Sequence, residues 1–184
     1  MGSAVRSDGV NGLPEQGVGA IMGERRRLIN LAYRLLGSSA DAEDVVRETY
    51  ARWYAMPRRE REAIGSPGGW LTTVASRICL NVLGSDRVRR EWAGAGPVAA
   101  ADPADVITLD ESVGMVSLVV LESMAPAERV AFVLHDVFQY PFAEVAAVVG
   151  RSSAACRQLA FSARHRIRVA QEAATPVEFL PVRG

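Results

Sequence analysis

Apolar residues recur every three or four positions in several stretches of this chain, and that spacing predicts amphipathic helices. The first stretch begins near Gly23 and ends at Gly37, and its apolar face consists of Leu28, Leu31, Ala32, Leu35 and Leu36. Ser38 is a predicted N-cap for a second helix, with Asp41 as its capping-box partner, and Pro57 stops that helix. The second apolar stripe consists of Ala42, Val45, Val46, Thr49 and Trp53. We expect these two helices to form an antiparallel hairpin.

A third helix is predicted after a polar loop from Pro57 to Gly65, because Ser66 can cap it and Pro67 fits its first position. Its apolar side consists of Leu71, Val74, Ala75, Ile78 and Val82. The other side carries Thr72, Thr73, Ser76, Arg77 and Asn81, with Trp70 at the start and Arg87, Arg89 and Arg90 at the end. An aromatic residue among hydroxyls, amides and arginines is typical of surfaces that bind single-stranded nucleic acid. The alternative is that Trp70 and Trp92 complete the core.

The second half of the chain predicts a helix-turn-helix between Phe142 and Arg168. A helix from Pro126, with Val130, Val133, Leu134 and Val137 inside, leads to a turn at Gln139, Tyr140 and Pro141. The first helix of the motif has Phe142, Val145, Ala146 and Val149 on one face, and Gly150 suits the left-handed turn that follows. Ser152 or Ser153 can cap the second helix, whose buried stripe is Cys156, Leu159, Ala160, Ala163 and Ile167.

The other face of that last helix carries the polar residues that would read DNA, namely Ser153, Arg157, Gln158, Arg164, His165 and Arg168. Near the start of such a helix, arginine can pair with guanine and glutamine with adenine, whereas later arginines suit phosphates. The alternative is an ordinary helical hairpin with a solvated basic face. No stretch alternates as a strand does, so the predicted fold class is all-α, with two helical domains joined by a linker.

The distribution of charged residues along the chain agrees with a division into two helical domains and a linker. The formal net charge is zero, but 13 arginines face 9 acids over 24–92, five acids stand without a cation over 93–124, and the charge is positive over 125–169. We therefore expect a tail over 1–22, a domain over 23–92, an acidic linker over 93–109, a second domain over 110–172 and a tail over 173–184. The linker stretch is rich in small residues and proline and has no periodicity.

Several function classes are disfavoured by what the sequence lacks. No apolar run approaches the roughly 20 residues that span a bilayer and no signal peptide is evident, so we expect a cytoplasmic protein with no membrane partner. Cys79 and Cys156 fall on apolar stripes, and no metal-ligand spacing or cofactor motif occurs. No nucleophile, paired-carboxylate or phosphate-loop arrangement indicates an enzyme.

Three blocks of the chain, in order, resemble the extracytoplasmic-function group of bacterial sigma factors. They are RLINLAYRLLGSSADAEDVVRETYARWY (Arg27 to Tyr54), GGWLTTVASRICLNVLGSDRVRRE (Gly68 to Glu91) and APAERVAFVLHDVFQYPFAEVAAVVGRSSAACRQLAFSARHRIR (Ala125 to Arg168). Within that group, the sequence is most similar to the SigJ-like subfamily, whose members usually carry an NTF2-like domain after the second helical domain. We expect a naturally short version or a truncated piece, because the stretch after Arg168 is too short for that domain. Two residues depart from the family's pattern. The residue before Pro126, usually Ser or Thr in the family, is Ala125 here. The position of Phe161 is usually occupied by a polar residue.

The resemblance implies a non-enzymatic role: joining core RNA polymerase, directing it to a promoter and assisting DNA melting. The first domain corresponds to sigma region 2 and the second to region 4. Docking on the clamp helices of the largest polymerase subunit would fall to Asp41, Glu43, Asp44, Val46, Arg47, Glu48, Thr49 and Trp53. Recognition of the −10 element as a single strand would fall to Trp70, Thr73, Arg77, Asn81, Arg87, Arg89 and Arg90.

Recognition of the −35 element by region 4 would fall to Arg151, Ser152, Ser153, Arg157, Gln158, Arg164 and Arg168. The family also implies contact with the flap of the second-largest polymerase subunit, and it leaves an anti-sigma factor open as a partner. The acidic linker would lie in a positively charged channel of the polymerase. Two alternatives stay open: a helix-turn-helix regulator that acts alone, and a sigma-like interaction protein without promoter activity.

Overall fold

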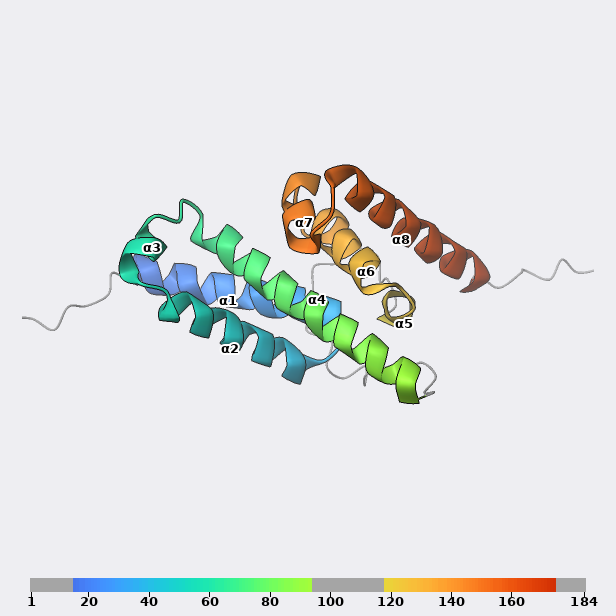
Figure 1. The fold of residues 1–184 in the computed structure, drawn as a ribbon, viewed down its shortest axis with the longest axis horizontal. Coiled ribbons are helices and arrows are strands. Elements are labelled where there is room, and N and C mark those ends of the chain that lie inside the picture. Colours follow the sequence, from blue (N-terminus) through green and yellow to red (C-terminus); the bar gives the residue numbers. More distant parts are fainter. Residues whose placement is uncertain (1–14, 94–117, 175–184) are drawn as a thin grey trace, which may run out of the picture.

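The chain folds into helices that lie in two packed groups, seen in Figure 1. This computed structural model describes residues 15–93 and 118–174, and all regular structure in those two ranges is helical, which confirms the all-α class. The first group is α1 (Glu15–Leu36), α2 (Ser39–Ala55), α3 (Arg58–Glu62) and α4 (Pro67–Ala93). The second is α5 (Leu118–Glu122), α6 (Pro126–Phe132), the π-helical turn η2 (Val133–Val137), α7 (Phe142–Val149) and α8 (Ser153–Ala174). The linker predicted over 93–109 lies almost wholly outside the described residues.

Helices α1 and α2 form the predicted antiparallel hairpin. Gly37 ends α1 with φ +75, a left-handed conformation that costs glycine little, and its N–H donates to the Tyr33 carbonyl at 2.8 Å. The Ser38 hydroxyl caps α2 by accepting from the backbone N–H of Asp41 at 3.2 Å. The two predicted apolar stripes are buried, except that Leu36 and Trp53 are half-buried.

Two predictions about the ends of elements are wrong in this first group. Helix α1 begins at Glu15, inside the stretch 1–22 that was expected to be a tail, because Gly17 and Gly19 lower helix propensity without preventing a helix. The expected polar loop after Pro57 contains α3. That short helix is supported by an ion pair one turn apart, in which Arg58 Nε lies 2.6 Å from Glu62 Oε1.

Helix α4 is buried on two sides, whereas one apolar side was predicted. The predicted cap is confirmed, since the Ser66 hydroxyl accepts from the Gly69 N–H at 3.2 Å. Thr72 and Ser76, which were expected to face away from the core, are only 3% and 0% exposed. Their side of α4 lies against α6 and α7 of the second group. We expected two independent domains, so the prediction included no contact of α4 with the second group.

The second group contains the predicted helix-turn-helix in α7 and α8. Gly150 has φ +71 and its N–H donates to the Ala146 carbonyl at 2.9 Å, so the turn is the left-handed one expected. The cap of α8 is Ser152, whose hydroxyl accepts from the Ala155 N–H at 3.1 Å. Four of the five predicted apolar residues of α8 are buried, and Leu159 is half-buried.

The segment before that motif has two irregular features. Ala125 cannot cap α6 with its side chain, and the remaining half of a capping box is the Glu128 carboxylate, which accepts from the Ala125 N–H at 3.1 Å. Gln139 has φ +59, the one positive φ at a described residue other than glycine, and its side-chain amide donates to the Asp136 carbonyl at 2.9 Å. This turn directs the chain from η2 into α7.

Buried apolar side chains of both groups belong to one continuous core. Cys79 and Cys156 lie in it as free, fully buried thiols, as their positions on apolar stripes predicted. None of the helices in the described part of the chain is long and apolar enough to cross a membrane.

Candidate nucleic-acid interface

The polar face of α8 presents Arg157 and Gln158 to solvent near the start of the helix. The Arg157 guanidinium lies 5.9 Å from the ring centroid of Phe142 on α7, within the range of a cation–π contact. These side chains line an open hollow of about 530 Å³ together with Ala154, Phe161 and Arg164. Arg157 and Gln158 are two of the three residues predicted to read bases, and the third, Ser153, is half-buried at the start of the same helix.

The remaining predicted −35 residues are held to different degrees. Arg164 pairs with Asp136 of η2, its Nε 2.7 Å from Oδ1 and its Nη2 3.3 Å from Oδ2. Arg168 donates to His165 Nδ1 at 3.0 Å and remains exposed. Arg151 is exposed, Ser153 is half-buried, and the hydroxyl of Ser152 serves as the cap. Arg151, Arg157 and Gln158 are therefore the side chains most available to an incoming ligand.

The predicted single-strand surface on α4 is only partly open. Trp70 is half-buried and packs on Trp53 with ring centroids 5.2 Å apart, so it contributes to the core, as the alternative interpretation required. Thr73 donates to the Gly69 carbonyl at 2.9 Å. Arg77 and Asn81 are exposed, and Arg77 Nη2 donates to the Ala147 carbonyl on α7 at 2.8 Å. The side chains of the last predicted residues, Arg87, Arg89 and Arg90, lie outside the described part of the structure, although their backbone continues α4.

The predicted docking face on α2 is acidic and exposed, but two of its residues are misplaced. Val46 and Thr49 are 1% and 0% exposed, and the Thr49 hydroxyl donates to the Val45 carbonyl at 2.7 Å, so neither can touch a partner. Both belong to the apolar stripe on the opposite side of the helix. The exposed residues are Asp41, Glu43, Asp44, Arg47 and Glu48, with Trp53 half-buried.

Ion pairs along α2 balance part of that charge. Asp44 Oδ1 lies 2.9 Å from Arg47 Nη1, and Glu48 pairs with Arg52. All four side chains are at least half exposed, so each pair contributes little to stability and can exchange for a partner's charges. Glu48 and Arg52 also line a groove of about 390 Å³ against α4 that reaches Asn81 and Asp86.

An exposed aromatic pair next to α3 was not predicted. Tyr54 is 59% exposed, its ring stacks on Tyr50 at 6.3 Å, and the Arg61 guanidinium lies 5.7 Å from its centroid. The four-residue spacing of Tyr50 and Tyr54 was the available signal, since residues i and i+4 meet on a helix surface.

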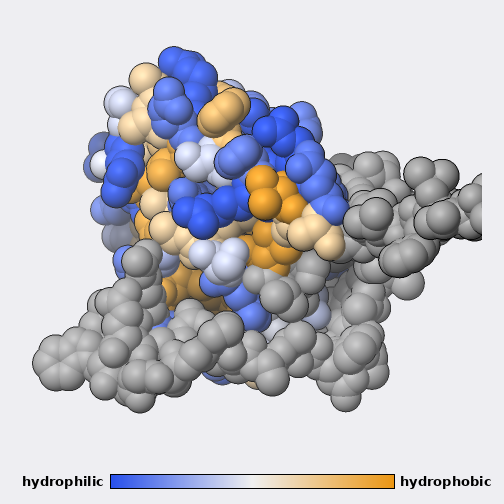
Figure 2. Space-filling view, turned by 90° about the vertical axis from the view of Figure 1, so that its right-hand side faces the viewer, coloured by the Kyte–Doolittle hydropathy of each residue, from blue (hydrophilic) through white to orange (hydrophobic). Residues whose placement is uncertain are grey.

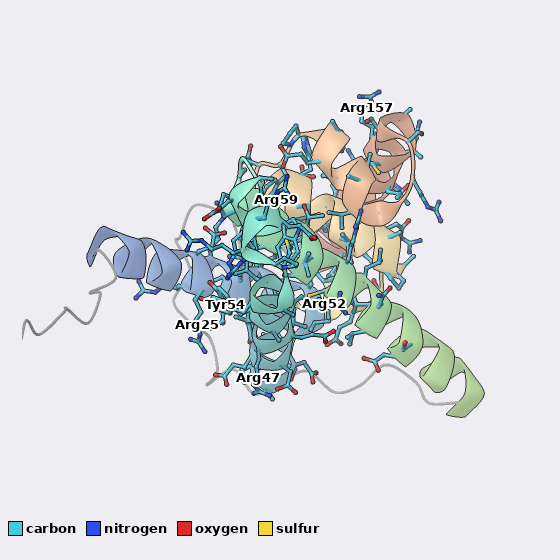
Figure 3. The ribbon with its side chains drawn as sticks, turned by 60° about the vertical axis from the view of Figure 1, so that its left-hand side comes forward. Arg25, Arg47, Arg52, Tyr54, Arg59 and Arg157 are labelled. Atoms are coloured by element: carbon cyan, nitrogen blue, oxygen red, sulfur yellow. The ribbon has the colours of Figure 1, made fainter. Side chains whose placement is uncertain are left out.

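A second surface feature is apolar. Phe161 and Val169 on α8 are 63% and 49% exposed, and they line a groove of about 690 Å³ with Val120 of α5. Figure 2 faces this end of the molecule and shows hydrophobic side chains gathered among hydrophilic ones. An apolar groove with a polar rim is typical of a protein contact. In Figure 3, Arg157 on α8 and Arg47 on α2 lie at opposite ends of the view, so the reading and docking faces are separate.

Comparison with known proteins places both groups in one family. The family model described as Sigma-70 region 2 matches residues 21–93, and that described as Sigma-70, region 4 matches residues 118–167. A protein named "Probable ECF RNA polymerase sigma factor SigI" from Mycobacterium tuberculosis is 40% identical over 82% of this chain and 54% of its own length. "ECF RNA polymerase sigma factor SigJ" from the same species is 45% identical over 78% of this chain and 47% of its own length.

Two solved structures are similar as well. The crystal structure of Mycobacterium tuberculosis SigJ has a TM-score of 0.63 and 38% identity, covering 85% of this chain and 57% of that one. RpoE of Bartonella quintana, solved with the anti-sigma factor NepR, has a TM-score of 0.63 and covers 88% of this chain and 99% of that one. At 19% identity, RpoE shows the fold alone. The chain spans about half the length of the curated relatives it matches. These matches confirm the resemblance drawn from the sequence, and the chain belongs to the sigma-70 family, of which it carries regions 2 and 4.

Proposed function

We propose that this protein is a promoter-specificity factor that binds core RNA polymerase and directs it to promoters in the cytoplasm, without catalysing a reaction itself. The observation that carries the proposal is that regions 2 and 4 occur in one chain, each with an exposed polar face. A regulator that acts alone would need the helix-turn-helix only. It would leave the acidic face of α2 and the arginines of α4 without a role.

In region 4, Arg157 and Gln158 would contact base edges of the −35 element. Their place near the start of α8 supports this, because that part of a recognition helix enters the major groove. The contact with the Phe142 ring favours one direction of the Arg157 guanidinium, which would lower the entropy lost when a base is bound. Arg151 and Ser153 flank the same helix start, and Arg164 and Arg168 lie further along it, where contacts to phosphates are expected.

In region 2, exposed Arg77 and Asn81 would contact the −10 strand, with Thr73 and Trp70 beside them and Arg87, Arg89 and Arg90 beyond. Half-buried Trp70 still offers part of its ring for stacking. Stacking and backbone contacts on a single strand offset the few kcal/mol needed to unpair and unstack a base. Melting would then follow from binding energy alone.

Docking on polymerase would use the exposed acids Asp41, Glu43, Asp44 and Glu48 of α2 with Arg47. Such a face complements a basic surface and sets the association rate more than the final affinity. The apolar groove at Phe161 and Val169 supplies a second contact of different chemistry, suited to the flap of the polymerase. An anti-sigma factor would have to compete for these same faces.

The test is co-purification of core polymerase with a charge-reversed variant, Asp44→Arg with Glu48→Arg. Both acids are exposed, so the fold should survive. Docking should fall below detection in size-exclusion chromatography, because arginines placed against a basic surface repel it, and like charges in contact cost several kcal/mol. The matched control is Glu172→Arg, an exposed acid on α8 with an arginine one turn away, which should co-purify as the unaltered protein does. If the double variant still bound core normally, α2 would not be the docking face.

A further inference from the structure

Apolar side chains line the hollow at the start of α8, next to the residues proposed to contact bases. On α8, residues 154, 157, 158 and 161 follow one another at spacings of three, one and three, so they share one face of the helix. We call the reading hollow the space of about 530 Å³ that is lined by Phe142, Ala154, Arg157, Gln158, Phe161 and Arg164. Half of its lining residues are therefore apolar, and the others can donate hydrogen bonds.

Phe161 is the apolar residue that the fold itself does not explain. Its side chain is 63% exposed, although it lies in one hollow with the apolar side chains of Phe142 and Ala154. Arg157 precedes it by four residues and Arg164 follows it by three, so both arginines are its neighbours on the helix surface. A ligand that suits this surface has to present an apolar group with negative charge close by.

The major groove of DNA offers that combination at thymine. Thymine carries a C5-methyl group in this groove, a group that the other three bases lack, and the phosphates of both strands border the groove. Alanine and phenylalanine side chains suit contact with the methyl group, whereas arginine and glutamine suit the hydrogen-bonding edges of guanine and adenine. The reading hollow thus contains side chains for a thymine methyl beside those for other bases.

Contacts within the protein form the apolar part of the hollow before any ligand binds. The imidazole of His135 on η2 stacks on the Phe142 ring, with ring centroids 3.8 Å apart and planes 25° apart. His135 Nδ1 donates to the Tyr140 carbonyl at 2.9 Å, which ties the imidazole to the turn before α7. Because Phe142 is held in this way, little of its side-chain freedom remains to be lost on binding.

We propose that the reading hollow binds the C5-methyl group of a thymine in the −35 element, and that Phe161 distinguishes this thymine from the other bases. The inference rests on the proposed function, because it requires α8 to enter the major groove of promoter DNA. It adds a base preference that hydrogen bonds cannot supply. Thymine and uracil present the same hydrogen-bonding edge and differ in the methyl group alone.

The experiment measures how single methyl groups affect promoter binding by polymerase holoenzyme that contains this protein. Holoenzyme first selects promoters from pooled upstream regions of the source genome. One selected promoter is then synthesised with deoxyuridine in place of each thymidine of its upstream motif in turn, and each duplex is titrated. We expect one deoxyuridine to weaken binding about 3- to 5-fold, the effect of removing one methyl group from an apolar contact. The other replacements should have little effect.

Variants of exposed residues assign this effect to the hollow. Phe161→Ser should bind the thymine and uracil promoters equally, because the methyl group then has lost its partner. Phe161→Leu keeps an apolar side chain and should retain part of the preference. The matched control is Val169→Ser, which changes another exposed apolar residue of α8. Val169 lines the groove shared with Phe161 and is not among the residues of the reading hollow, so the methyl effect should be unchanged.

Three results would overturn the inference while leaving the proposed function intact. They are an upstream motif without thymine, equal binding of every thymine and uracil promoter by the unaltered protein, and a methyl effect that persists in Phe161→Ser. A holoenzyme that binds core polymerase but selects no promoter from the pool would overturn the proposed function, and this inference with it.

Discussion

Arg157 shows how a neighbouring aromatic ring can restrict an exposed side chain before any ligand binds. It is exposed, yet Phe142 limits its directions through the cation–π contact described above. Arg164, about two helical turns further on, is instead paired with Asp136. Two arginines that look equivalent in the sequence therefore differ in how freely their guanidinium groups can meet a ligand.

Replacing Arg157 by alanine should weaken binding of polymerase holoenzyme to its −35 element by about 1–3 kcal/mol and relax base choice there. Electrophoretic or anisotropy titrations with base-substituted promoters would measure both effects. The control is Arg166→Ala, because Arg166 is exposed on the opposite side of α8 and faces Glu128 at 3.5 Å. Equal promoter preference in the Arg157 variant and the wild type would remove this residue from the reading surface.

Cys79 should make stability depend on pH in the alkaline range. Burial raises the pKa of the Cys79 thiol from about 9 to about 12, because the thiolate is poorly solvated in the core. The folded state thus keeps its proton after the unfolded chain has lost it. The contribution of the protonated Cys79 thiol to the free energy of unfolding is complete below pH 9. It is lost as the pH rises toward 12, with a slope of up to ~1.4 kcal/mol per pH unit.

Urea unfolding at several pH values would test this. Cys79→Ala should be less stable at pH 7, since it leaves a small cavity, but it should lose about 2 kcal/mol less than the wild type between pH 9 and pH 11. All measurements need a reductant to keep both thiols free. Parallel curves for the two proteins would contradict a buried, protonated thiol at this position.

Among the structural elements, the helix-turn-helix and the α1–α2 hairpin could be predicted from two signals. These were the periodicity of apolar residues and the glycine and serine residues that end or cap the helices. Gly37, Gly150 and Ser38 each act locally, so their roles are readable from neighbours in sequence. The second buried side of α4 was not predicted, because Thr72 and Ser76 are polar, and because Tyr140, which donates a hydrogen bond to Thr72, lies 68 residues away in the chain. Val46 and Thr49 were assigned to docking from family position, although their place on the apolar stripe already indicated burial.

Gly→Ala substitutions at two positions distinguish the effect of backbone conformation on stability from the effect of steric clashes with a new Cβ. A Cβ at either Gly84 or Gly150 would meet no atom within 4 Å. Gly84 lies inside α4, so Gly84→Ala should stabilise the protein by roughly 0.5–1 kcal/mol. Gly150 has φ +71, so Gly150→Ala should destabilise it by about 1 kcal/mol. Denaturant titration gives both values, and the same sign for the two would show that φ does not decide the outcome.

At the scale of the whole molecule, charge and packing act together. A net charge of zero conceals an acidic face on α2 and arginines on α4 and α8, so the proposed docking face and the proposed DNA-contacting faces differ in charge. The core runs through both regions, and the two cannot separate without exposing part of it.

The proposed function requires that this protein give core polymerase a promoter preference. The direct measurement is in vitro transcription by purified core polymerase, with and without the protein, on pooled upstream regions of the source genome, followed by sequencing of the transcripts. We expect new start sites that share two spaced motifs and that disappear with the Asp44→Arg, Glu48→Arg variant. Transcripts that are the same with and without the protein, despite stable binding to core, would contradict it.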